Sequence, residues 1–175
     1  MAKKWIAAGL LIALTAIAIF QAVDKKEETG VKSEAIVDGL KPGVKAPDFE
    51  LKTLKGDTIK LSSLKGKKVM LNFWATWCGP CKAEMPAMQQ LSTEVGDDVV
   101  ILAVNIDPQL DVQGFVDENG ITFPIPLDVD DKVNALYQII AIPTTYFIDS
   151  NGIIQDVFKG AMPHDAMVQY VNDLK

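Results

Sequence analysis

Trp77-Cys78-Gly79-Pro80-Cys81, directly after the apolar run Val69-Met70-Leu71-Asn72-Phe73-Trp74, decides the fold of this chain. Cys78 and Cys81 are the only two cysteines among 175 residues, so any sulfur chemistry takes place here. The apolar run is typical of a central strand that is covered on both faces. Pro80 suits the first position of a helix, where its missing N–H is not needed. We therefore expect a strand, a turn that carries Cys78, and a helix whose first turn contains Cys81.

Two cysteines at this spacing suit a structural, a metal-bound or a redox-active role. A structural disulfide is thought to stabilise mainly by restricting the unfolded chain, and so short a loop restricts it little. A zinc site needs about four ligands, and the chain offers only one histidine, the distant His164. At the start of a helix, by contrast, unpaired backbone N–H groups and the helix dipole favour a thiolate. The pattern therefore favours a redox pair with no metal and no cofactor, and it leaves His164 a surface or capping role.

The composition argues against one broad class of function. The net charge is −6, and all 17 positively charged residues are lysines. Arginine, whose planar fork is favoured for phosphate and nucleic-acid recognition, is absent from the sequence. We therefore expect no nucleic-acid partner, and because the cysteine motif needs only one chain we expect a monomer.

The N-terminal segment predicts a membrane anchor. The run from Trp5 to Val23 holds 19 residues without a charge and has lysines on both flanks. A helix of that length is ~28 Å long, close to the thickness of the hydrocarbon core of a bilayer. The alternative is a cleaved signal peptide, because Ala16-Ile17-Ala18 offers a small-x-small cleavage site. We expect residues 1–23 to be an uncleaved single-pass anchor in the cell membrane, with the rest of the chain on the extracytoplasmic side.

Beyond this segment the sequence divides into a stalk and one folded domain. Residues 24–45 are mostly polar or small and indicate a solvated stalk, with a short helix around residues 34–40. Residues 46–175 form the expected domain. Its predicted strands cover residues 49–51, 58–61, 69–74, 99–106, 123–127, 144–148 and 153–158, and its predicted helices cover residues 80–95, 112–119, 133–140 and 164–174.

The order of these elements indicates an α/β sandwich on a mixed sheet. Lys55-Gly56-Asp57 is expected to turn the first hairpin, and Asn151-Gly152 is a strong turn signal for the last one. Gly96 is a suitable stop for the helix after the cysteines. The acidic run from Asp128 to Asp131 lacks the remaining ligands of a calcium loop, so it is better interpreted as a helix N-cap.

Four ordered segments resemble the thioredoxin superfamily, and most closely its membrane-anchored TlpA/ResA-like thiol-disulfide oxidoreductases. They are Ala46-Pro47-Asp48-Phe49, the stretch from Asn72 to Cys81, Glu84-Met85-Pro86 and Ile142-Pro143-Thr144-Thr145. The resemblance covers about residues 46–175. It implies a thioredoxin-like mixed sheet flanked by helices, with an N-terminal hairpin and a central strand-helix insertion over about residues 120–140. It also implies a cis peptide at Ile142-Pro143, lying against the disulfide.

Two positions depart from ordinary thioredoxins. Asn72 stands where those proteins carry a buried aspartate, and Gly79-Pro80 stands where several anchored relatives place a charged residue first. Glu84 follows Cys81 by three residues on the same helical face, and it matches a glutamate that related proteins keep near the thiols. A carboxylate there would raise the thiol pKa and could accept a proton from the resolving cysteine. The alternative is an ordinary exposed helix glutamate.

The resemblance implies thiol-disulfide exchange in which Cys78 attacks a client disulfide, Cys81 resolves the mixed disulfide, and Glu84 assists. The residues expected to face the client are Trp77, Gly79, Pro80, Ile142 and Pro143. Apocytochrome c, in cytochrome c maturation, is the leading client that the family implies, and a membrane thiol reductase of the CcdA or DsbD type is the implied electron donor. The alternatives are a disulfide donor of the same fold, a thiol peroxidase and a copper-binding maturation factor.

Overall fold

The computed structural model describes residues 40–174. The predicted membrane anchor, the short helix around residues 34–40 and most of the predicted stalk lie outside these residues. Within residues 40–174, no helix is both long enough and apolar enough to cross a membrane. The elements in chain order are β1 (Glu50–Lys52), β2 (Thr58–Lys60), the 3-10 helix η1 (Leu61–Leu64), β3 (Lys68–Trp74), α2 (Gly79–Glu94), β4 (Val99–Asn105), α3 (Val112–Glu118), α4 (Lys132–Leu136), β5 (Thr144–Ile148), β6 (Ile154–Lys159) and α5 (His164–Asp173).

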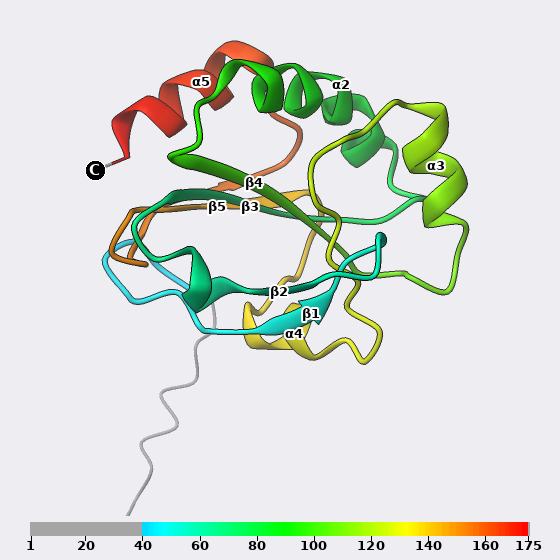
Figure 1. Cartoon of the computed structure of the whole chain (residues 1–175), viewed down its shortest axis with the longest axis horizontal. Coiled ribbons are helices and arrows are strands. Elements are labelled where there is room, and N and C mark those ends of the chain that lie inside the picture. The colour runs from blue at the N-terminus through cyan, green and yellow to red at the C-terminus, as the bar shows by residue number, and fades with distance from the viewer. Residues whose placement is uncertain (1–39, 175) are drawn as a thin grey trace, which may run out of the picture. The chain divides into compact units, whose positions relative to one another are not determined.

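A four-stranded mixed sheet of order β4-β3-β5-β6 forms the centre of the domain (Figure 1). β3 and β4 are parallel, whereas β5 is antiparallel to both β3 and β6. The turn between β5 and β6 places Gly152 at φ +82°, a left-handed conformation that glycine adopts without strain. β1 and β2 pair separately as an antiparallel hairpin. The mixed sheet and both hairpins therefore confirm the sequence prediction.

Strand β3 separates two layers of the core. Met70 and Trp74 face the layer that contains α2, α3 and α5, whereas Leu71 and Phe73 face the layer that contains the β1–β2 hairpin and α4. These two layers lie above and below the sheet in Figure 1. All four side chains are fully buried, as expected for a strand whose alternate residues point to opposite covered faces. Asn72 lies on the same face of β3 as Met70 and Trp74, so it points toward α2.

The prediction of a strand over residues 123–127 is wrong, because the structure has no regular strand there. The segment runs beside β4 but makes only isolated bridges, from Pro126 to Thr53 and from Leu127 to Asn105. The carbonyl groups of Pro124 and Pro126 accept the N–H groups of Ala103 and Asn105. The two prolines have no N–H to return, so the segment cannot form a continuous ladder with a neighbour. It covers the edge of β4 as irregular chain.

The helix predicted over residues 133–140 is shorter than expected. α4 ends at Leu136, and Gln138 adopts φ +53°, which a right-handed helix cannot contain. A helix continued to residue 140 would turn Ile140 to the same face as the buried Val133, but Ile140 is 77% exposed. Asp131 is the N-cap residue of α4 but makes no side-chain cap hydrogen bond. The Asp128 carboxylate accepts the N–H groups of residues 133 and 134 instead, so the acidic run caps the helix as predicted, but from Asp128.

The long helix α2 matches its prediction apart from its ends. It begins at Gly79, so Pro80 occupies the second helical position and not the first. It ends at Glu94, and Val95 leaves it in an extended conformation. Gly96, which follows this C-cap, does not have the positive φ of a glycine that ends a helix. Met85, Met88 and Leu91 are buried beneath the helix, as their spacing predicts.

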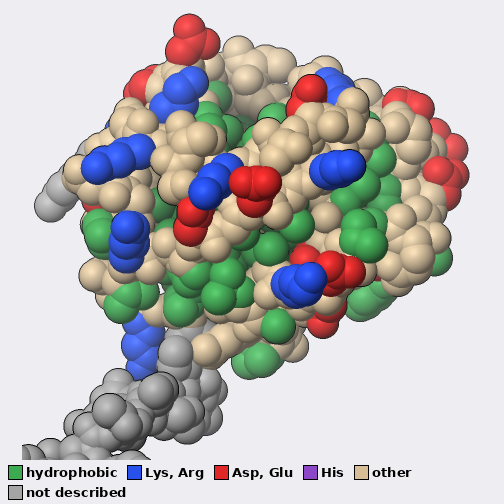
Figure 2. Space-filling model, turned by 60° about the horizontal axis from the view of Figure 1, so that its bottom comes forward, with side chains coloured by type: hydrophobic (Ala, Val, Ile, Leu, Met, Phe, Trp, Pro, Cys, Tyr) green, Lys and Arg blue, Asp and Glu red, His purple; other side chains and the backbone are tan. Residues whose placement is uncertain are grey.

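The face that carries the β1–β2 hairpin and α4 comes forward in Figure 2, where hydrophobic side chains lie between scattered charged ones. A groove of about 420 Å³ runs between β1 and the segment from Leu127 to Leu136. Its rim includes the exposed Val129 and an ion pair between Lys132 and Asp130. No cysteine lines this groove, so sulfur chemistry does not take place there.

Candidate active site

The two cysteines form a disulfide at the N-terminus of α2. Cys78 is the N-cap residue, and the N–H of Cys81 donates to its Sγ at 3.2 Å. Cys78 is 5% exposed, whereas Cys81 is completely buried. Cys78 is therefore the sulfur that a client can reach. In the reduced protein the same N–H group and the end of the helix favour the thiolate form of Cys78.

A cis peptide bond between Ile142 and Pro143 lies beside this turn, as predicted. The carbonyl oxygen of Ile142 is 3.7 Å from the Sγ of Cys78. The two segments meet because β5 begins directly after Pro143 and pairs with β3, whose last residues lead to the cysteines. The backbone of the Ile142-Pro143 segment thus lies next to the sulfur of Cys78.

Glu84 is buried behind the disulfide, on the side of α2 that packs on the sheet. Its side chain is 2% exposed, and its carboxylate accepts the backbone N–H of Met162 at 3.0 Å and the amide of Asn72 at 2.9 Å. Burial raises the pKa of Glu84 to about 7 from an ordinary value of 4.5, and the two hydrogen bonds offset part of the increase. A carboxyl with this pKa exchanges protons near neutral pH, as a general acid or base must. The ordinary exposed-glutamate interpretation is therefore wrong.

Asn72 links this carboxyl to the neighbouring strand. Its Nδ2 donates both to Glu84 Oε1 and to Thr145 Oγ1, each at 2.9 Å. Its Oδ1 is buried without a hydrogen-bond partner among the described residues. A turn of the amide would bring Oδ1 to the carboxyl, where it can accept the proton of neutral Glu84. Asn72 can therefore serve both protonation states of Glu84, although it cannot take up the proton itself.

The remaining residues predicted for the client surface lie around Cys78. Trp77 is 64% exposed, and Gly79 and Pro80 are also exposed, whereas Ile142 is half-buried and Pro143 is buried. One residue near the site, Thr145, received no functional role from the sequence. It belongs to the quoted motif, but its hydrogen bond to Asn72 arises only because β3 pairs with β5.

Within residues 40–174, no group of three or more His, Cys, Asp or Glu side chains is placed to hold a metal ion. His164 lies at the first position of α5 and contacts Glu94 of α2 at 2.7 Å. It therefore occupies the surface position predicted for it, at the junction of two helices.

The sequence of this chain is similar to those of known proteins over most of its length. The AhpC/TSA family matches residues 42–157. The chain is 43% identical over 176 residues to "Thioredoxin-like protein YneN" of Bacillus subtilis, covering 97% of each protein. It is 49% identical over 138 residues to "Thiol-disulfide oxidoreductase ResA" of Oceanobacillus iheyensis, covering 75% of this chain and 72% of that protein.

The fold is likewise similar to solved structures. The crystal structure of StoA from Bacillus subtilis superposes with a TM-score of 0.64 at 34% sequence identity. The match covers 74% of this chain and 98% of StoA. The thioredoxin-like fold predicted from the four motifs is therefore confirmed for the described domain.

Proposed function

We propose that this chain, which belongs to the AhpC/TSA family, reduces disulfides in extracytoplasmic client proteins. Its ResA relatives place it among the thiol-disulfide oxidoreductases of the thioredoxin superfamily. The observation that carries the proposal is the disulfide between Cys78 and Cys81, placed at a helix N-terminus with a buried carboxyl behind it. The more accessible sulfur thus lies at the N-cap of α2, and the resolving sulfur and a proton acceptor lie within the helix.

In the first step the Cys78 thiolate attacks one sulfur of the client disulfide. A bond forms between Cys78 Sγ and that sulfur, the client disulfide breaks, and the second client sulfur leaves as a thiolate. The N–H of Cys81, which donates to Cys78 Sγ, and the helix N-terminus favour the attacking thiolate. The client backbone lies along the Ile142-Pro143 segment, with Trp77 against its side chains.

In the second step Cys81 loses its proton and attacks Cys78 Sγ. The disulfide between the two cysteines forms, and the first client sulfur leaves as a thiolate, so the client gains two electrons in total. We propose that Glu84, one helical turn after Cys81, accepts that proton when it is ionised. Its pKa of about 7 allows it to release the proton again near neutral pH.

We further propose a place and a client class for this activity. The uncharged N-terminal run supports a single-pass anchor in a bacterial cell membrane, with the catalytic domain outside the cytoplasm. Apocytochrome c is the proposed client, because its haem-binding cysteines must be reduced before haem can be attached. Electrons then have to cross the membrane, and a membrane thiol reductase of the CcdA or DsbD type is the proposed donor.

A direct test uses a peptide that contains an oxidised Cys-x-x-Cys-His segment as the client. Reduced wild-type protein should convert the peptide to its dithiol and become oxidised in equal amount. Cys78→Ser should be inactive, whereas Cys81→Ser should remain joined to the peptide, as seen by mass spectrometry. The proposed client class is refuted if the peptide is reduced no faster than an unrelated disulfide peptide of equal length.

A thiol peroxidase is the second candidate, because Ala46-Pro47-Asp48-Phe49 also opens peroxiredoxin-like domains and the AhpC/TSA family matches this region. Such sites depend on an arginine that stabilises the reactive thiolate, and the sequence contains none. Hydrogen peroxide consumption by the reduced protein discriminates between the two functions. The reductase proposal predicts consumption no faster than that of free dithiothreitol.

A further inference from the structure

The turn that carries Cys78 is bonded to a buried carboxylate that the chemistry above does not use. The hydroxyl of Thr76 donates to Asp107 Oδ2 at 2.8 Å, and the N–H of Thr76 lies 3.2 and 3.3 Å from the two carboxylate oxygens. Asn105 Nδ2 donates to Asp107 Oδ1 at 2.7 Å. Asp107 is 3% exposed, so these charge-assisted bonds are protected from water.

The carboxylate is itself fixed in place. Asn105 is the last residue of β4 and pairs in register with Trp74, the last residue of β3. Its side-chain oxygen accepts the N–H of Asp107 at 3.1 Å, and its own backbone bonds to Pro126 and Asp128. Asp107 therefore sits on the rigid end of the sheet, and Thr76 is bonded to that end.

Ala75 and Cys78 of this turn are themselves buried in the core, and Thr76 adds a polar bond between the turn and the end of the sheet. Thr76 lies two residues before Cys78, and the residue between them, Trp77, is 64% exposed and contributes little packing. The backbone of the turn is bonded at Cys78 N–H to Ala75, within the turn itself. Among the described residues, the bonds from Thr76 to Asp107 are the side-chain hydrogen bonds that join residues 75–77 to the sheet.

We propose that Asp107 is a positioning residue for thiol-disulfide exchange. By holding Thr76, it keeps Cys78 at the N-terminus of α2 and beside the Ile142 carbonyl. Asp107 touches neither sulfur nor client in this role and acts through Thr76. The proposal rests on the thiol chemistry that family membership establishes, and it is independent of the client and of the direction of electron flow.

The first test replaces Thr76 in the full-length protein, in a Cys81→Ser background that leaves Cys78 as the only thiol. Thr76→Val removes the hydroxyl donor but keeps the side-chain volume and the charge of Asp107. The readout is alkylation by iodoacetamide across pH, in which the Cys78 thiolate displaces iodide and forms a thioether. We expect the rate at pH 7 to fall by about five- to tenfold, because a higher pKa of Cys78 leaves a smaller fraction of it as the reactive thiolate. The pKa of Cys78 should rise, since a displaced turn weakens the N–H bond to Sγ.

Thr76→Ser is the rescue variant, because it keeps the hydroxyl. Its alkylation profile should stay within twofold of the Thr76 protein. Asp107→Asn tests the other partner, since an amide offers one acceptor oxygen where the carboxylate offers two. It should slow alkylation at pH 7 by at least as much as Thr76→Val.

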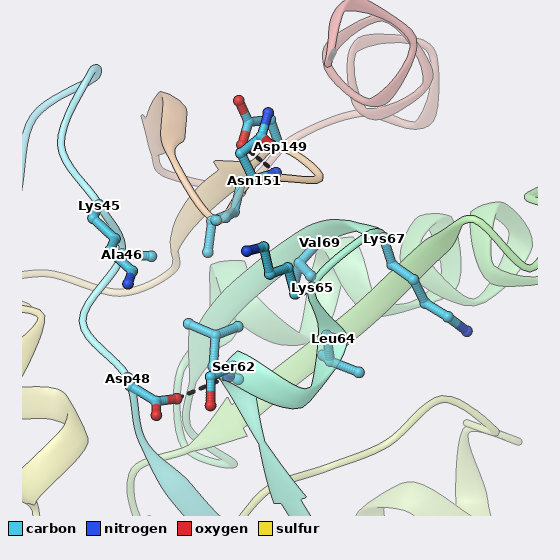
Figure 3. A pocket seen from close by; sticks show the side chains of 13 residues that line it. Lys45, Ala46, Asp48, Ser62, Leu64, Lys65, Lys67, Val69, Asp149 and Asn151 are labelled. Atoms are coloured by element: carbon cyan, nitrogen blue, oxygen red, sulfur yellow. Dashed lines mark hydrogen bonds between the residues drawn. The ribbon is translucent and has the colours of Figure 1, made fainter.

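Asp149 supplies a matched control. It is 5% exposed and also accepts three hydrogen bonds, from the N–H groups of Asn151 and Ile153 and from the amide of Gln155. It lies at the opposite end of β3 from the cysteines, on the wall of a pocket of about 150 Å³ (Figure 3). Asp149→Asn should lower the melting temperature, as Asp107→Asn does, yet leave the Cys78 alkylation profile unchanged.

The proposal is overturned if Thr76→Val keeps the parent alkylation profile within twofold, or if Asp149→Asn slows alkylation as much as Asp107→Asn. If Asp107→Asn does not fold, the comparison of valine with serine at position 76 decides the question. Alkylation needs no client, so a failure of client reduction with a normal effect of Thr76→Val would refute the proposed function and leave this proposal standing.

Discussion

Substituting Glu84 by glutamine tests how strongly the fold disfavours a charge behind the disulfide. The side chain is 2% exposed, and burial raises its pKa to about 7 from an ordinary value of 4.5. That difference corresponds to about 3 kcal/mol, at about 1.4 kcal/mol for each pKa unit. Ionised Glu84 therefore destabilises the folded protein by roughly this amount relative to neutral Glu84.

The sign of the pH dependence follows from the order in which the two states ionise. The unfolded chain releases the Glu84 proton near pH 4.5, whereas the folded protein retains it until about pH 7. The stability associated with neutral Glu84 is thus fully present below pH 4.5 and is lost as the pH rises through 7. Glutamine cannot ionise. Between pH 4.5 and 8, the free energy of unfolding of Glu84→Gln should therefore rise by about 2–3 kcal/mol relative to that of wild type.

The assay is urea unfolding of the oxidised full-length protein at constant ionic strength across this pH range. Glu118→Gln is the control, because it removes one negative charge from an exposed position on α3. Its free energy of unfolding should follow that of wild type at every pH. If the Glu84→Gln and wild-type curves remain parallel within about 0.5 kcal/mol, the reasoning from burial is refuted.

Three further predictions follow from the same structure. Cys81→Ser should accumulate a covalent adduct with a disulfide peptide through Cys78, and an adduct through any other residue would contradict the assignment of the attacking sulfur. Trp77→Ala should raise the KM for a peptide client several-fold and leave the melting temperature nearly unchanged, because the side chain is 64% exposed. Equal losses of stability and activity would contradict a client-facing role. Leu102→Ala should lower the free energy of unfolding by about 2–5 kcal/mol in urea, because Leu102 is completely buried, and a loss below about 1 kcal/mol would contradict its place in the core.

The sequence predicted the region around the cysteines well because several local rules agree there. An apolar run, a cysteine N-cap and an early proline all specify a strand, a turn and a helix in that order. The Asn151-Gly152 turn and the Asp128 cap were predictable for the same reason, since each depends on residues close together in the chain.

Two predictions failed because a few residues have backbones that do not fit the predicted element. Residues 133–140 have helical spacing, yet the left-handed Gln138 ends that spacing before Ile140. Residues 123–127 are apolar enough for a strand, but Pro124 and Pro126 remove the donors that a ladder requires. Periodicity describes the burial of side chains, and it does not test whether the backbone can complete its hydrogen bonds.

The site was only partly predictable because its supporting contacts join distant strands. The position of Glu84 one turn after Cys81 follows from helical spacing, but its burial depends on Asn72 of β3 and on the N–H of Met162. The Asp107–Thr76 contact depends on the register of β3 with β4. No local signal in the sequence predicts either packing arrangement.

The reduction potential of the Cys78–Cys81 pair tests the central claim most directly. It is measured by equilibrating the full-length protein with glutathione or dithiothreitol buffers and quantifying the disulfide that remains. We expect a value near or below about −250 mV, which is in the range of thioredoxin and suits a reductase supplied with electrons through the membrane. A value near about −120 mV would identify a disulfide donor and contradict the proposed direction of electron flow.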